Sequence, residues 1–187
     1  MRRSTVLALA GLLCASGSLL AQQGQLRQLG RAVIEYRSPS VNAVAAYEYS
    51  RRNHDGAWLL VELAVLARER IAIDRNQISL LTPKEEVVPV ATQRQFLEDH
   101  EAINQLLQSA TVSRRPIGLY FTTRLQPTIR FFAFPGSVVH DTFVTNRDEA
   151  AGGDVLFKSP QGRWEAGTYI LRINHPEAQA QLPIELE

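Results

Sequence analysis

The chain has 187 residues, of which 45% are hydrophobic, so it is long enough to bury a core of its own. Its 20 Lys and Arg residues nearly balance its 19 Asp and Glu residues, which argues against the strongly basic surface that is typical of nucleic-acid-binding proteins. The chain has one cysteine, Cys14, which excludes a disulfide within the chain.

Residues 1–21 have the pattern of a secretory signal peptide. Arg2 and Arg3 give a positively charged start, residues 6–13 are apolar, and small residues follow. The apolar run is shorter than the roughly 20 residues that a membrane span requires. We expect cleavage after Ala21, and therefore a secreted or periplasmic protein without a transmembrane segment.

Two alternatives for this leader stay open. Cleavage after Gly17 is the second choice. A lipoprotein is less favoured, because Leu13 rather than a small residue precedes Cys14. Cleavage after Ala21 removes the only cysteine and leaves 18 basic against 19 acidic residues, a net charge of −1. Such a mature chain has no thiolate for a metal site or a nucleophile.

The rest of the chain contains no repeat and no Pro- or Gly-rich linker. We therefore expect a flexible leader at residues 22–30, where glutamines dominate, and one domain over residues 31–187.

Strand-like segments alternate with turn residues along this domain. Residues 58–67 are apolar at both alternating sets of positions, with only Glu62 interrupting one set, which favours a central strand over a buried helix. Residues 41–49 fit either a helix or a strand. Pro89 predicts a strand at a sheet edge. The predicted strands are residues 32–36, 58–67, 78–81, 87–90, 117–122, 129–134, 138–145, 154–158, 167–173 and 180–187.

One helix is predicted over residues 93–109. Thr92 and Gln95 have the spacing of a capping box, and an apolar stripe follows from Phe96 to Ala110. Short alternating strands with this single inserted helix predict a mainly β fold, namely a β-sandwich against which the helix packs.

Two segments resemble parts of known domains. Residues 73–83 (IDRNQISLLTP) resemble a segment of bacterial exported immunoglobulin-like domains, although Lys84 and Glu85 replace the usual turn glycine. Residues 162–171 (GRWEAGTYIL) resemble the Gly-x-Trp-x-x-Gly-x-Tyr-x-Leu ending of many sandwich domains. The chain is thus similar to bacterial exported immunoglobulin-like β-sandwich proteins of unknown function. The resemblance implies an antiparallel immunoglobulin-like sandwich and supplies no catalytic residue.

Residues able to perform catalysis or bind metal are dispersed. Zinc or copper sites usually include ligands at short spacing, and no two histidines lie close in sequence, which favours surface or locally hydrogen-bonded roles. His140 and Asp141 are neighbours near Ser137, but adjacent residues of a strand point to opposite faces, so a hydrolase triad is disfavoured. The four histidines are His54, His100, His140 and His175.

Two further groups of residues each allow two interpretations. Residues 146–154 contain three carboxylates beside Gly152 and Gly153, and we expect a solvated hairpin loop, with a Ca²⁺-binding loop as the alternative. Aromatic residues gather at residues 120–121 and 131–134, and we expect a central strand covered by the helix, with an exposed apolar groove as the alternative.

The sequence therefore predicts no catalytic, cofactor-binding or metal-ligating residue and no cofactor. We expect a non-catalytic binding or assembly module of the cell envelope that recognises a protein or peptide, for example by adding a strand at a sheet edge. The alternatives are an accessory domain that binds a small ligand or Ca²⁺ and a secreted hydrolase.

Overall fold

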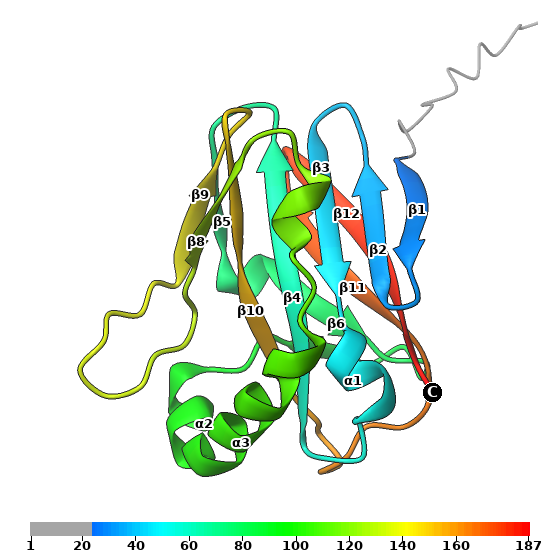
Figure 1. Cartoon of the computed structure of the whole chain (residues 1–187), viewed down its shortest axis with the longest axis vertical. Coiled ribbons are helices and arrows are strands. Elements are labelled where there is room, and N and C mark those ends of the chain that lie inside the picture. The colour runs from blue at the N-terminus through cyan, green and yellow to red at the C-terminus, as the bar shows by residue number, and fades with distance from the viewer. Residues whose placement is uncertain (1–23) are drawn as a thin grey trace, which may run out of the picture.

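In the computed structural model, which describes residues 24–187, apolar faces of two β-sheets meet to form the main core (Figure 1). The expected signal peptide and residues 22–23 lie outside the described residues. The larger sheet is antiparallel except for the β10–β8 pair, which is parallel. Its strands, in spatial order, are β1 (Gln25–Gly30), β2 (Val33–Arg37), β3 (Val41–Ala46), β4 (Trp58–Ala67), β10 (Glu149–Lys158) and β8 (Arg124–Ile129).

The second sheet packs against the larger one, and a two-stranded sheet completes the β structure. The second sheet has the order β12 (Ala178–Leu186), β11 (Gly167–His175), β6 (Ile78–Leu81) and β7 (Val87–Pro89). The small sheet pairs β5 (Ile71–Asp74) with β9 (Thr142–Thr145). The helices are α1 (Glu48–Arg52), α2 (Gln93–Glu98) and α3 (His100–Ala110), with 3₁₀ turns η1 (Arg75–Gln77), η2 (Thr111–Ser113) and η3 (Ile117–Tyr120).

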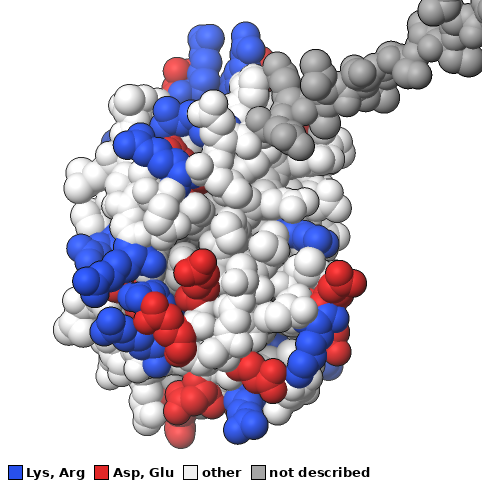
Figure 2. Space-filling model, turned by 90° about the vertical axis from the view of Figure 1, so that its right-hand side faces the viewer, with Lys and Arg blue, Asp and Glu red and all other residues white. Residues whose placement is uncertain are grey.

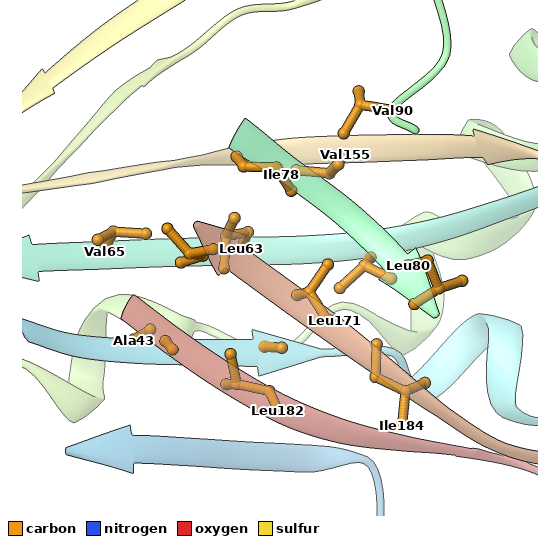
Figure 3. Packing of buried hydrophobic residues seen from close by; sticks show 14 of the residues in the cluster. Ala43, Leu63, Val65, Ile78, Leu80, Val90, Val155, Leu171, Leu182 and Ile184 are labelled. Carbon is orange, nitrogen blue, oxygen red and sulfur yellow. The ribbon is translucent and has the colours of Figure 1, made fainter. Parts of the chain in front are cut away.

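The main core lies between the two sheets. Side chains from β3, β4 and β10 point toward those from β6, β11 and β12 (Figure 3). Leu63 of β4, Leu80 of β6 and Leu171 of β11 are fully buried there. Burial of such a side chain contributes about 1.5–3 kcal/mol, and this shared layer fixes how the sheets stack.

Strand β4 is apolar on both faces because both faces are covered. Leu59, Val61 and Leu63 face the second sheet, whereas Trp58 and Leu60 lie in a separate cluster on the outer face with residues of α2 and α3. Helix η3 covers the outer face farther along β3 and β4. The prediction of a strand over residues 58–67 is confirmed, with its bounds.

The predicted helix is confirmed, but it is divided at Asp99. Thr92 Oγ1 accepts a hydrogen bond from Gln95 N and Gln95 Oε1 accepts one from Thr92 N, so the expected capping box caps α2. The Asp99 backbone is non-helical, and its carboxylate accepts hydrogen bonds from Trp58 Nε1 (3.0 Å) and Lys158 Nζ (2.7 Å). These bonds hold the break in the helix over the ends of β4 and β10.

Several further strand predictions are confirmed, and the ambiguity over residues 41–49 is resolved. Those residues divide into β3 and the start of α1. Strand β7 contains Pro89 and forms the edge of the second sheet, as expected. The mainly β class and the strands β2, β6, β11 and β12 agree with the sequence patterns.

Three predictions near the middle of the chain are wrong in whole or in part. Residues 117–122 contain η3 rather than a strand, because Ile117 and Phe121, four residues apart, are both buried on the outer face of the larger sheet. The strand expected at 129–134 lies earlier, at β8. The strand expected at 138–145 is reduced to β9.

Two segments expected to lack regular structure are strands. Residues 25–30, expected within the flexible leader, form β1, because their backbone pairs antiparallel with β2. Residues 149–153, expected within a hairpin loop, begin β10. Strand β5 was not predicted from the sequence. No helix within residues 24–187 combines the length and the apolar character that a membrane span requires.

Candidate functional site

A cleft lies over β10 on the outer face of the larger sheet, and we call it the β10 cleft. It consists of two hollows of about 340 and 400 Å³, which share five lining residues. These shared residues are Arg114, Pro127, Gly152, Gly153 and Asp154. Hollows of this size fall within the range of pockets that bind small ligands.

The course of β8 opens this cleft. Strand β8 runs beside β10 only as far as Gly153, which pairs with Ile129, and the chain then leaves the sheet through residues 130–134. A Cβ atom at Gly153 would overlap the backbone oxygen of Ile129, and one at Gly152 would crowd Leu125. The two glycines therefore permit close approach of β8 rather than a turn.

Aromatic rings form one wall of the cleft. Phe96 of α2 stacks on Phe132 with ring centroids 5.4 Å apart and meets the edge of Phe134 at 5.2 Å. Phe134 is 39% exposed. Phe131 points the other way, into the main core. The aromatic residues are therefore covered by the helix in part, but they do not lie in a central strand as expected, since residues 131–134 follow β8, an edge strand, and Phe121 lies in a separate cluster under η3.

A charged pair lies where the two hollows meet. Arg114, which follows η2, donates from Nη1 to Asp154 Oδ1 (3.0 Å) and from Nη2 to Asp154 Oδ2 (2.6 Å). This two-point geometry fixes both side chains, and the hydrogen bonds to Asp154 raise the pKa of Arg114 above its ordinary value.

Glu62 of β4 lies beside this pair. Its register partner on β10 is Asp154, so both side chains leave the sheet on its outer face with Cβ atoms about 4.5–5.5 Å apart. Burial raises the pKa of the Glu62 carboxyl to about 7, a rise that nearby Asp154 reinforces and Arg114 opposes. Among residues 24–187 no ion-pair partner lies within 4.0 Å of this carboxylate.

The half-buried carboxylate and the apolar walls define what the cleft offers a ligand. Glu62 provides a hydrogen-bond acceptor that takes up or releases a proton near neutral pH. Asp154 is occupied by Arg114 and is held as a structural partner. The remaining surface, from Ile129, Phe132 and Phe134, offers apolar contact.

The four histidines lie apart within separate elements or turns. His100 Nδ1 is 3.2 Å from the Leu97 carbonyl oxygen, and His175 Nδ1 accepts from Glu177 N, which are local contacts of the expected kind. His140 donates its backbone N–H to Arg130 O. In residues 24–187, no group of three or more His, Cys, Asp or Glu side chains is arranged to hold a metal ion.

Other predicted candidates are also separated by the fold. The carboxylate of Asp141 pairs with Arg75 at 3.1 Å, and Ser137 closes a turn on Phe134. The expected loop at residues 146–154 is shorter than predicted, because the turn is closed by the Asn146–Glu149 bridge and β10 begins at Glu149. Along a strand, Asp148 and Asp154 are about 20 Å apart, so they do not share an ion.

The cleft floor was not predicted from the sequence, since Gly152, Gly153 and Asp154 were considered only as part of a loop, although two signals pointed to the floor. Glu62 is the only charged residue in the apolar run of β4. Gly152 and Gly153 lie together within a segment otherwise suited to a strand, a pattern that can mark close backbone approach. The position of Arg114 had no such signal, since its role depends on how the chain returns after α3.

The strand edges differ in how well they could accept another strand. Among the four edge strands of the two larger sheets, β8, β7 and β12 contain Pro127, Pro89 and Pro183. Proline lacks an N–H donor and opposes strand addition. Strand β1 has no proline and is mostly exposed.

The side of the molecule at β1 carries charges of mixed sign. Figure 2 shows this side, with charged side chains of both signs around a broad uncharged middle. A hollow of about 770 Å³ here is lined by Leu26, Tyr36 and Val87 together with polar residues of β11 and β12. Among residues 24–187, charges of one sign are not concentrated on this face in a way that would select a ligand.

Comparison of the chain with protein-family models, with curated proteins and with solved structures finds no match.

Proposed function

We propose that the protein is an exported, non-catalytic binding module of the cell envelope, and that the β10 cleft receives an apolar segment of a protein or peptide partner. The observation that supports this most is the partly exposed aromatic wall of Phe134 and Phe132, which lines the hollow of about 340 Å³ next to the one of about 400 Å³. Export, to the periplasm or beyond, is supported by the pattern of residues 1–21.

The distribution of exposed apolar side chains supports the same face. Five of the eight large hydrophobic side chains exposed in residues 24–187 come from residues 93–138, the segment that crosses the outer face of the larger sheet. They are Leu97, Val112, Leu119, Phe134 and Val138. Of these, Phe134 lines the cleft, and the other four lie on the same segment of the chain outside the lining residues.

We further propose that the two large sheets form an immunoglobulin-like sandwich. Tyr169 lies near the start of β11, and its hydroxyl donates to Glu165 O (2.9 Å) and accepts from Glu165 N (3.3 Å). This resembles the tyrosine corner of such sandwiches. Trp164 packs edge-on against the same ring at 5.5 Å. The helices between β7 and β8 are then an insertion that builds the cleft.

The arrangement of polar groups supports binding rather than catalysis. Hydrolysis by two carboxylates requires a proton donor and a second carboxylate that is accessible to substrate or water. Here Glu62 meets the first requirement, but both oxygens of Asp154 accept from Arg114.

Selection from a library of random heptapeptides displayed on phage tests the proposed function. We expect the purified protein to enrich peptides rich in apolar residues. Phe134→Asp should abolish enrichment, because it places a charge on the aromatic wall. Leu26→Asp is the matched control, since Leu26 is also exposed but lies on β1. Absence of enrichment, or equal enrichment by Phe134→Asp, would contradict the proposal.

Strand addition at β1 is the second candidate. It is favoured by one observation, namely that β1 alone among the four edge strands of the larger sheets has no proline. In this case Leu26→Pro should abolish peptide capture, and Phe134→Asp should leave it unchanged.

A further inference from the structure

We infer that the β10 cleft selects partner segments with a basic side chain, and that the cationic end of this side chain binds the Glu62 carboxylate at the cleft floor. This inference rests on the proposed function, because it specifies the partner of the same cleft. It concerns a lysine or arginine placed between apolar residues of the partner.

Negative charge exceeds positive charge at the floor of the cleft. Two carboxylates, Glu62 and Asp154, face a single guanidinium, that of Arg114. Asp154 takes both terminal nitrogens of Arg114, so Arg114 makes no ion pair with Glu62, and although Arg114 lowers the Glu62 pKa, the three groups together carry one net negative charge when Glu62 is ionised. A positively charged group is the complement of such a floor.

An ionised Glu62 carboxylate without an ion-pair partner is energetically unfavourable. The half-buried carboxylate has lost part of its hydration, as its raised pKa shows, and no ion pair within residues 24–187 compensates it. A buried charge that lacks a partner is unfavourable, and a bound cation relieves this cost. An apolar ligand without a hydrogen-bond donor does not relieve the unfavourable energy of the unpaired carboxylate.

The walls that lead to the floor of the cleft are suited to a side chain with an apolar stem. The hollow that contains Glu62 is also lined by Leu125, Pro127 and Ile117, which are apolar along most of their surface. A lysine side chain has a similar construction, with an apolar stem and a charged tip. The stem would contact the apolar walls while the ammonium group reaches Glu62.

The other basic groups that line the cleft are Arg115 and Arg130, and Arg130 donates from Nε to the Pro127 backbone oxygen (2.9 Å). Arg115 lies at the rim and pairs with Glu48 at 3.6 Å. Farther along the outer face of β10, Lys158 pairs with Asp99. On the β3 side the register partner of Glu62 is Ala46, which has no charge. The pH dependence of binding therefore comes chiefly from ionisation of Glu62, which lies beside Arg114 and Asp154.

The test uses the heptapeptide that the selection enriches most, resynthesised with capped ends. We expect it to contain a lysine or arginine flanked by apolar residues. Exchange of that residue for norleucine, which keeps an apolar stem without the charge, should weaken binding at pH 8.5 at least tenfold by calorimetry. Glu62→Gln should abolish the difference between the two peptides, whereas Glu101→Gln, on the exposed side of α3, should preserve it.

The outcomes separate this inference from the proposed function. Enriched peptides without a basic residue, or equal affinity of the norleucine peptide, would overturn the inference and leave the apolar cleft as the binding surface. Failure of any peptide to bind would overturn the proposed function itself. Retention of the preference for lysine at pH 5.5, where Glu62 is protonated, would also overturn the inference.

Discussion

Glu62→Gln should stabilise the protein above pH 7 and have little effect near pH 5. In the folded state burial raises the pKa of this carboxyl from 4.5 to about 7. Between these values the unfolded chain releases its proton while the folded chain retains it, so ionisation favours unfolding. Stability from this group is present below pH 4.5 and is lost as the pH rises to 7. Glutamine removes this dependence.

The size of the effect follows from the two pKa values. At about 1.36 kcal/mol for each pKa unit, the full difference is about 3 kcal/mol, and solvent screening of a half-exposed carboxyl reduces it to about 1–2 kcal/mol. For a domain of this size, that corresponds to a rise of roughly 2–8 °C in melting temperature at pH 8.

Urea unfolding of the wild type and of Glu62→Gln at pH 5, 6, 7 and 8 measures the effect. The difference in unfolding free energy should grow with pH and level off above pH 7. Glu101→Gln is the control, because Glu101 is exposed on α3. A constant difference across this range, or one that shrinks as the pH rises, would refute the reasoning about Glu62.

Two substitutions test the parts of the fold that position the cleft. Gly153→Ala should destabilise the protein by about 1–3 kcal/mol, because the new Cβ would overlap the Ile129 oxygen, whereas Gly56→Ala meets nothing within 4 Å and should not. Tyr169→Phe should lower the unfolding free energy by about 1–2 kcal/mol through loss of the two hydrogen bonds to Glu165. Urea titrations check both, and unchanged midpoints would contradict them.

Local sequence patterns predicted the elements whose structure is determined by residues within the element itself. The alternation in residues 58–67 gave β4 with its bounds, and the Thr92–Gln95 pair placed the start of α2. Pro89 correctly indicated an edge. In each case, the periodicity or the capping chemistry lies within a few residues of the element that it specifies.

Elements whose structure depends on distant contacts were not predicted. Residues 117–122 have the composition of a strand, but burial of Ile117 and Phe121 over β3 and β4 favours the 3₁₀ turn. In the sequence Gly152 and Gly153 suggest a turn, but in the structure they allow β8 to lie close beside β10. Strand β1 has few apolar residues, and its structure comes from pairing with β2. Tertiary context overrides local propensity at all three places.

The candidate site was predictable only in part. The aromatic residues were singled out, and the apolar groove was one of two interpretations of them. Glu62 stood out as a charge in an apolar run, but its proximity to Asp154 and Arg114 follows from the β4–β10 register and from the return of the chain after α3. Neither relation is encoded by local spacing.

The most direct test of the central claim is to locate a selected peptide on the protein. In ¹⁵N-labelled protein, titration with the peptide should shift the backbone amide signals of residues 130–134 and 152–156, which border the β10 cleft. The signals of β1 should be unaffected. Shifts confined to β1 and its neighbours, with the β10 cleft unperturbed, would contradict the account.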